Sequence, residues 1–197
     1  MCNHSVRFYD ETYPADAASD FIAAGLLAGD ACIVMLIEPH RHAVEQRLNA
    51  RGIRTAPESH HSGSYRAIDT HDALSQLMVD GRLSHDRATE SLGALLSHAT
   101  LGGGRGVRLV GDPAPTLFAA GNQEDAIALE GLVDGLAIVH GASVFCAYPI
   151  QSFCREGNTN ALMRVSAEHS ALEFPDGLWI RGYLKTTPMQ ARREGQF

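Results

Sequence analysis

The chain has 197 residues, of which 45% are hydrophobic and 20% are charged, and its formal net charge at pH 7 is −7. These values fit one globular domain with a full hydrophobic core, and the acidic balance disfavours direct binding to nucleic acid or to an anionic membrane, which both select for clustered lysine and arginine. Because no apolar run approaches the roughly 20 residues that cross a bilayer, and the N-terminus lacks the layout of a secretory signal, we expect a cytoplasmic protein.

The first forty residues predict a strand, a helix and a second strand. Val6 and Phe8 mark the first strand, and the apolar run at residues 32–37 marks the second. Between them, apolar and small residues recur at helical spacing, which predicts a helix. The turn at residues 10–14 carries two carboxylates and neither glycine nor lysine. In many nucleotide-binding α/β proteins this turn is a glycine-rich phosphate loop, so the predicted architecture and the chemistry of the turn disagree.

Helices and strands continue to alternate along the chain. Helices are predicted over residues 38–52, 71–79, 85–100, 115–120, 123–140 and 158–170, and strands over residues 65–69, 107–110 and 143–148. The pair Asp80–Gly81 is interpreted as the end of the third helix. We therefore expect a single domain at residues 1–170, and a C-terminal extension at 171–197 with one strand candidate at 178–184 and a mobile end.

Apolar strands separated by helices predict a three-layer α/β fold, in which helices cover both faces of a mostly parallel sheet. Ligands of such sheets bind beyond the carboxyl ends of the strands. Those ends fall at residues 9–13, 38, 69, 112 and 148–151. Four of these five places carry an acidic residue, so we expect an edge that is poor in positive charge.

Phosphate binding in the usual manner is excluded. A phosphate loop needs backbone N–H groups exposed by glycine and a lysine for the terminal phosphates. The glycine-rich stretch LGGGRGV precedes a strand instead of following one, and it contains no lysine. We interpret it as a loop.

Two carboxylates at strand ends have two interpretations each. Asp112 lies where P-loop enzymes carry a magnesium-associated acid, but a role as the N-cap of the following helix is favoured. Glu38 has the position of a general base, but a carboxylate in the first turn of a helix, stabilised by the helix dipole, is favoured.

The remaining reactive side chains give no catalytic or metal motif. The sequence contains no HExxH, CxxC or GxSxG pattern, so no catalytic residue and no metal ligand is predicted, and most of the ten histidines are interpreted as surface residues. Cys32 and Cys146 lie in apolar strand candidates and are interpreted as core residues. His4, just before the first strand, is a candidate for a ligand or signalling role. Glu130 interrupts an apolar helical face, and it lies either at the helix edge or against a polar partner.

Several short blocks in a fixed order carry a family resemblance. They are HxxxxY (His4 and Tyr9), FIAAGLLAGDACIV, HRHAVEQRLNARGI, LMVDGR, VRLVGD, AAGNQEDAIALE and FCAYP. This set resembles the MEDS domain, the sensory domain of methanogens and of the methylotroph dichloromethane regulator DcmR. The MEDS family is in turn similar to RecA-like ATPases of the KaiC type that have lost the phosphate loop. The resemblance implies a RecA/KaiC-like fold without a functional P-loop, and it leaves a homo-oligomer open.

The function that the resemblance implies is sensing. A small, hydrocarbon-like ligand or a regulatory protein partner would bind, and the change would pass to a separate output protein such as a kinase or a transcription regulator. The expected binding residues lie mainly at the carboxyl edge: His4, Tyr9, Asp10, Glu11, Thr12, Tyr13, Glu38, Asp112 and Tyr148. No cofactor is expected. The alternative is a residual ATPase-like enzyme that uses Glu38 and Asp112 with magnesium.

Overall fold

A computed structural model describes residues 4–55, 64–101, 105–154 and 158–175. Its centre is a six-stranded sheet in the order β3-β2-β6-β7-β1-β8, and every neighbouring pair runs parallel. The strands are β1 (His4–Tyr9), β2 (Ala31–Leu36), β3 (Tyr65–Asp69), β6 (Val107–Gly111), β7 (Ala142–Pro149) and β8 (Ala171–Glu173). The predicted parallel α/β sheet is confirmed.

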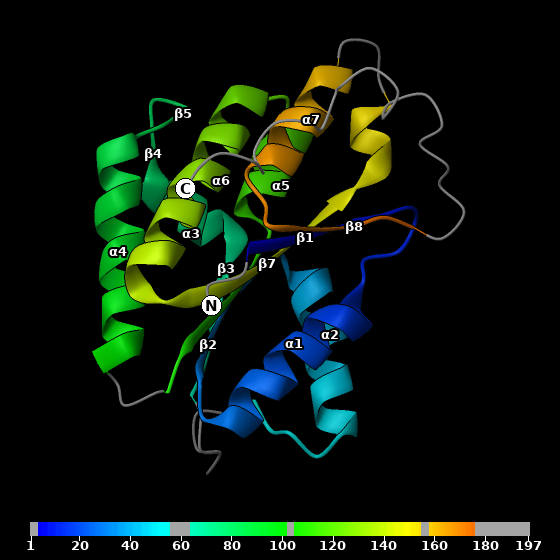
Figure 1. The fold of residues 1–197 in the computed structure, drawn as a ribbon, viewed down its shortest axis with the longest axis vertical. Coiled ribbons are helices and arrows are strands. Elements are labelled where there is room, and N and C mark those ends of the chain that lie inside the picture. Colours follow the sequence, from blue (N-terminus) through cyan, green and yellow to red (C-terminus); the bar gives the residue numbers. More distant parts are fainter. Residues whose placement is uncertain (1–3, 56–63, 102–104, 155–157, 176–197) are drawn as a thin grey trace, which may run out of the picture.

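Helices cover both faces of this sheet, as Figure 1 shows. Helices α1 (Ala15–Ala28) and α2 (Glu38–Ala50) pack together on one face. The other face carries five helices: α3 (Thr70–Leu77), α4 (His85–Leu101), α5 (Pro113–Ala119), α6 (Gln123–His140) and α7 (Thr159–Ala167). A single turn of 3₁₀-helix, η1 (Ile150–Phe153), follows β7.

Two hydrophobic cores result from the alternation of side chains along the strands. In β2, Ile33 and Met35 point to the core under α3–α7, whereas Val34 and Leu36 point to the core under α1 and α2. Because β2 is buried on both faces, all six of its residues are buried and its sequence is apolar throughout. The same alternation places His4, Val6 and Phe8 of β1 on the α6 and α7 side, with Tyr9 on the other side.

Two local features differ from the expectation. Helix α3 ends at Leu77, and residues 78–83 form a small antiparallel hairpin of β4 (Met78–Val79) and β5 (Arg82–Leu83). Asp80 and Gly81 both have positive φ, of 50° and 75°, as a two-residue hairpin turn requires. The expected helix over residues 71–79 is therefore too long, because Asp-Gly is a hairpin signal as well as a helix end.

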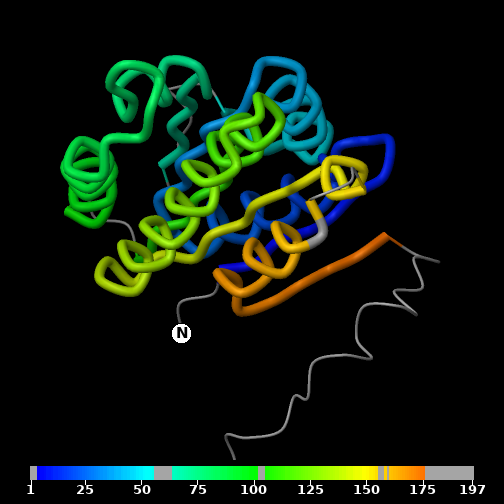
Figure 2. The backbone as a smooth tube through the Cα atoms, turned by 90° about the horizontal axis from the view of Figure 1, so that it is seen from above, coloured from blue at the N-terminus to red at the C-terminus, as the bar shows by residue number. Residues whose placement is uncertain are grey.

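The C-terminal part of the described chain adds an edge strand. Residues 171–173, which we placed in the extension, form β8 beside β1 (Figure 2). The strand candidate at 178–184 lies outside the described residues.

Candidate functional site

Three aromatic rings pack together at the carboxyl end of β1, beside the turn where a phosphate loop would lie. Tyr13 is buried and stacks on the His40 ring of α2, with ring centroids 3.8 Å apart and planes 13° apart. Tyr9 meets the edge of Tyr13 at 5.9 Å. The Tyr13 hydroxyl is buried and has no hydrogen-bond partner within the described chain. The turn is therefore filled by side chains, where a phosphate loop would leave open backbone N–H groups.

Asp112 is buried beside these rings and connects β6 to the start of α2. Its Oδ2 accepts a hydrogen bond from the backbone N–H of Ile37 at 3.1 Å and lies 2.8 Å from Nδ1 of His40. Asp112 occupies the N-cap position of α5, as the favoured interpretation predicts, but its side chain makes no capping hydrogen bond there. Burial, and secondly the charge of Asp112, raise the pKa of Tyr9 to about 12.

The predicted binding residues divide between two faces of the sheet. Tyr9, Tyr13 and Asp112 come together at the carboxyl edge, where Asp10 accepts a hydrogen bond from Gln151. Glu11, Thr12 and Glu38 lie at the surface there. His4 and Tyr148 are buried on the opposite face, under α6.

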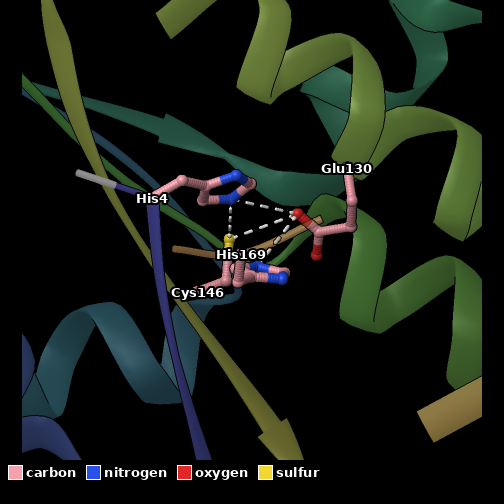
Figure 3. Close-up of side chains that lie close together, drawn as sticks. All are labelled: His4, Glu130, Cys146 and His169. Carbon is pink, nitrogen blue, oxygen red and sulfur yellow. Dashed lines mark hydrogen bonds and ion pairs between the residues drawn. The ribbon is translucent and has the colours of Figure 1, made fainter. Parts of the chain in front are cut away.

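On that opposite face, four buried reactive side chains converge from four parts of the chain (Figure 3). They are His4 of β1, Glu130 of α6, Cys146 of β7 and His169, which follows α7. We call this set the His-Glu-Cys-His cluster. The Oε2 atom of Glu130 lies 3.3 Å from Nε2 of His4, 3.5 Å from Sγ of Cys146 and 3.6 Å from Nε2 of His169.

Outer contacts orient three of the four side chains in the cluster. The Tyr148 hydroxyl donates to the second oxygen of Glu130, Oε1, at 2.7 Å. The Nδ1 of His169 lies 2.7 Å from the backbone carbonyl of Val165, and because a carbonyl only accepts, this nitrogen carries a proton. The Nδ1 of His4 lies 3.3 Å from a carboxylate oxygen of Asp134. Both imidazoles thus present Nε2 to the centre of the cluster.

The cluster combines an ionised Glu130 with a neutral His169 ring and a protonated Cys146 thiol. Burial acts to raise the pKa of Glu130, but the hydrogen bond from His4 and the nearby histidine and tyrosine groups outweigh it and lower that pKa. Burial lowers the pKa of His169, which favours the neutral imidazole. Burial, and then Glu130, raise the pKa of Cys146 well above its usual range. A full charge is therefore held in the core, where it is costly unless it is paired.

A small apolar cavity adjoins the cluster. It lies between the sheet and α3–α6, and its wall includes Gly111, Pro113 and Ala114, together with Glu130 and Cys146. Its free volume is about 20 Å³, room for about one water-sized molecule. Apart from Glu130 and Cys146, its lining is apolar.

Sequence reasoning missed most of the cluster. His4 was a candidate, and the open question about Glu130 is answered by its burial against a polar partner. Cys146 is indeed a core residue, but one in contact with Glu130 and His4. The surface interpretation is wrong for His169, which is 8% exposed. The signal in the sequence was the lone carboxylate in an apolar helical face, because a buried charge requires partners.

Comparisons with known proteins support one assignment. No curated protein matches the chain. Within the described residues, no helix is both long and apolar enough to cross a membrane. The model of one family, described as the methanogen/methylotroph DcmR sensory domain (MEDS), matches residues 4–167, most of the chain. The chain belongs to the MEDS family of sensory domains.

Proposed function

We propose that this domain is a non-enzymatic sensor, which takes up a small, largely apolar molecule in the cavity between the sheet and α3–α6. The observation that carries the proposal is the position of this cavity. It reaches the carboxyl ends of β2 and β6 at Met35 and Gly111, and its lining is apolar apart from Glu130 and Cys146. Pockets of parallel α/β sheets that bind ligands lie at this end of the strands.

The size of the cavity restricts the ligand. A free volume of about 20 Å³ has room for about one water-sized molecule, so an ordinary metabolite or nucleotide is too large. Because protein interiors are close-packed, even a small guest would displace the surrounding helices slightly. Ligand uptake would then be coupled directly to a conformational change.

Helix α5 offers a route from the cavity to the surface. Pro113 and Ala114, in its first turn, line the cavity, and Asp112 directly precedes them. Asp112 in turn contacts His40 and the backbone of Ile37 at the start of α2. A shift of α5 would therefore alter the stacked rings of His40 and Tyr13 at the carboxyl edge, where an output partner, such as a kinase or a transcription regulator, would detect it.

The absence of phosphate-loop chemistry supports sensing over hydrolysis. The turn after β1 is filled by Tyr13 and flanked by exposed carboxylates, which repel phosphate. Glu38 lies at the surface, and the Asp112 side chain is engaged with the start of α2. This arrangement is consistent with a relative of RecA-like ATPases that has lost the nucleotide-binding site.

The experiment is a ligand series followed by NMR. Xenon, chloromethane and benzene are titrated into the protein, and the methyl resonances of cavity residues and the ring resonance of His40 are recorded. We expect xenon and chloromethane to shift both sets of signals and benzene to have little effect. Ala114→Val should abolish the shifts by filling the cavity, whereas Ala23→Val, in the opposite core, should retain them. Unchanged spectra with all three probes would refute the proposal.

A further inference from the structure

We propose that His4, Glu130, Cys146 and His169 bind one divalent transition-metal ion, for which Zn²⁺ is the best match. The proposal revises the expectation that the chain has no metal ligands. It is independent of ligand uptake in the neighbouring cavity.

Four of the six distances between the ligand atoms match the edges of a tetrahedron around a metal. Bonds of about 2.0–2.3 Å from zinc to nitrogen, oxygen and sulfur imply ligand-to-ligand distances of about 3.3–3.7 Å. The distances of 3.3, 3.5 and 3.6 Å from Glu130 Oε2, and the 3.5 Å between Cys146 Sγ and His4 Nε2, all fall in this range. All four ligand atoms lie within 4.8 Å of one another.

An unpartnered nitrogen points into the centre of the cluster. Since Nδ1 of His169 donates to Val165, Nε2 of the neutral ring carries a lone pair. That atom is buried and has no hydrogen-bond partner in the described part of the chain, although the Glu130 carboxylate lies 3.6 Å away. Two electron-rich atoms that face each other in the core need a positive charge between them.

A shared proton satisfies this arrangement less well than a cation. A proton on His4 can bridge to Glu130 at 3.3 Å, but at 3.6 Å the contact from His169 to the same oxygen exceeds hydrogen-bond length. A metal ion at the centre would contact all four atoms at once. Metal binding displaces the thiol proton of Cys146 to solvent, and the charges of Glu130 and of the resulting thiolate then cancel those of a divalent ion, so that a buried neutral centre results.

The outer partners are those that metal-bound side chains use. A ligating histidine commonly donates its second nitrogen to a carboxylate or a backbone carbonyl, which turns the first nitrogen to the metal. His169 donates to the carbonyl of Val165 in this way, and Nδ1 of His4 lies 3.3 Å from the Asp134 carboxylate without a hydrogen bond in the described chain. The hydroxyl of Tyr148 engages Oε1 of Glu130 and leaves Oε2 for the metal.

The donor set selects the class of ion. Two imidazoles, one thiolate and one carboxylate suit Zn²⁺, or Fe²⁺ and Co²⁺ in the same geometry. Mg²⁺ and Ca²⁺ prefer sites made only of oxygen ligands, and the thiolate disfavours them. Because four protein groups complete the tetrahedron, the site resembles a structural centre that joins β1, β7, α6 and the segment after α7.

The test is metal binding by the full-length chain, purified without a histidine tag. Its metal content is measured by mass spectrometry, the metal is removed by chelation, and Co²⁺ is then titrated. We expect about one ion per chain, d–d bands of tetrahedral intensity and a thiolate-to-cobalt charge-transfer band, all of which Zn²⁺ but not Mg²⁺ displaces. A wild-type chain that gives no cobalt spectrum overturns the proposal.

Cysteine variants identify the thiolate. The triple variant Cys2→Ser, Cys32→Ser, Cys154→Ser retains Cys146 alone and should keep the charge-transfer band. Cys146→Ser should lose the band, and Cys32→Ser, at an equally buried cysteine outside the cluster, should keep it. If the triple variant loses the band, the assignment is wrong even if Cys146→Ser fails to fold.

Histidine and carboxylate variants test the remaining ligands and the contact of Asp134 with His4. His169→Ala and Glu130→Gln should remove tight Co²⁺ binding, whereas His71→Ala, at an exposed histidine, should not. Asp134→Asn should weaken binding about tenfold or more by releasing the orientation of His4, with the band retained. Full affinity in His169→Ala would place the metal elsewhere.

Discussion

Tyr148 and Glu130 form a buried pair in which the phenol hydroxyl donates to Oε1 of the carboxylate at 2.7 Å. Tyr148 is fully buried in β7, and Glu130 is 1% exposed in α6. The pair connects the sheet to the helix that covers it, and it divides the carboxylate into one oxygen bound to the tyrosine and one that faces the histidines and Cys146. A charge in the core is thus fixed to one place and one orientation.

Removal of this hydroxyl should destabilise the fold. Tyr148→Phe leaves Oε1 of Glu130 buried without its donor, and we expect the free energy of unfolding to fall by about 1.5–3 kcal/mol. Urea denaturation followed by circular dichroism measures the change. Tyr65→Phe is the matched control: its hydroxyl donates to Glu45 at 3.1 Å but is less buried, so a loss of about 1 kcal/mol or less is expected. Equal losses in the two variants would contradict the expectation that a buried carboxylate oxygen without a donor costs more free energy than a partly exposed one.

Gly25 in α1 is required by close packing against the sheet. A Cβ at this position would lie 2.4 Å from Cδ of Arg108 and 2.9 Å from Sγ of Cys32. Arg108 cannot easily move, since it pairs with Asp30 at 2.9 Å and donates to the carbonyl of Phe21. Gly25→Ala should therefore lower stability by about 1–3 kcal/mol, despite the better helix propensity of alanine.

A second glycine provides the control for Gly25. Gly135 in α6 is exposed, and nothing lies within 4 Å of a Cβ built there. Gly135→Ala should raise the free energy of unfolding by up to about 1 kcal/mol through helix propensity alone. Thermal and urea denaturation of both variants should give opposite signs. A stabilised Gly25→Ala variant would show that α1 can move away from β2 and β6 at little cost.

The β4–β5 hairpin should be sensitive to acid through Asp125. This carboxylate accepts hydrogen bonds from Arg82 at 2.9 and 3.0 Å and from the backbone of Leu83 at 3.1 Å. The hydrogen bonds from Arg82 lower the pKa of Asp125 below the usual value for an aspartate, and the bond from the Leu83 N–H adds to this effect. The ionised Asp125 carboxylate therefore contributes its full stabilisation above the unfolded-state pKa of about 3.9. This stabilisation is lost as the pH falls through the lower folded-state pKa.

Asp125→Asn provides the measurement. Urea denaturation at pH 7 should show a loss of about 1–2 kcal/mol relative to the wild type, and the difference should shrink below about pH 4. Because Arg82 is largely exposed, the effect should also decrease in high salt. A difference that stays constant down to pH 3 would mean that the ionised carboxylate has no special role.

ATP–magnesium should leave the stability of the protein unchanged. The turn after β1 offers no glycine or lysine, and Tyr13 fills it. A ligand at a hundredfold excess over its dissociation constant stabilises the folded state by about 2.7 kcal/mol, so calorimetry at millimolar ATP detects even weak binding. A rise of this size, abolished by Asp112→Asn, would favour the residual ATPase that uses Glu38 and Asp112.

The sequence alone determined the elements and their layering. The run at residues 32–37 is almost wholly apolar because β2 is buried on both faces, and the run at 107–110 is apolar except for Arg108. That pattern predicts a covered parallel sheet. The filled turn after β1 could likewise be predicted in part, since a loop without glycine and lysine cannot hold phosphate. The predicted helix over residues 71–79 is too long, because the pair Asp80–Gly81 is typical both of a helix end and of a hairpin turn, and here it forms the hairpin turn.

Only the tertiary structure decided which side chains meet. His4 and Tyr9 lie five residues apart on one strand, so strand alternation sends them to opposite faces, and a common site for both was excluded by this geometry. His4, Glu130, Cys146 and His169 are separated by up to 165 residues along the chain, and no local spacing relates them. They meet because β1 pairs with β7 while α6 and α7 cover the same face, a relationship that long-range pairing creates and that periodicity in a single sequence does not contain.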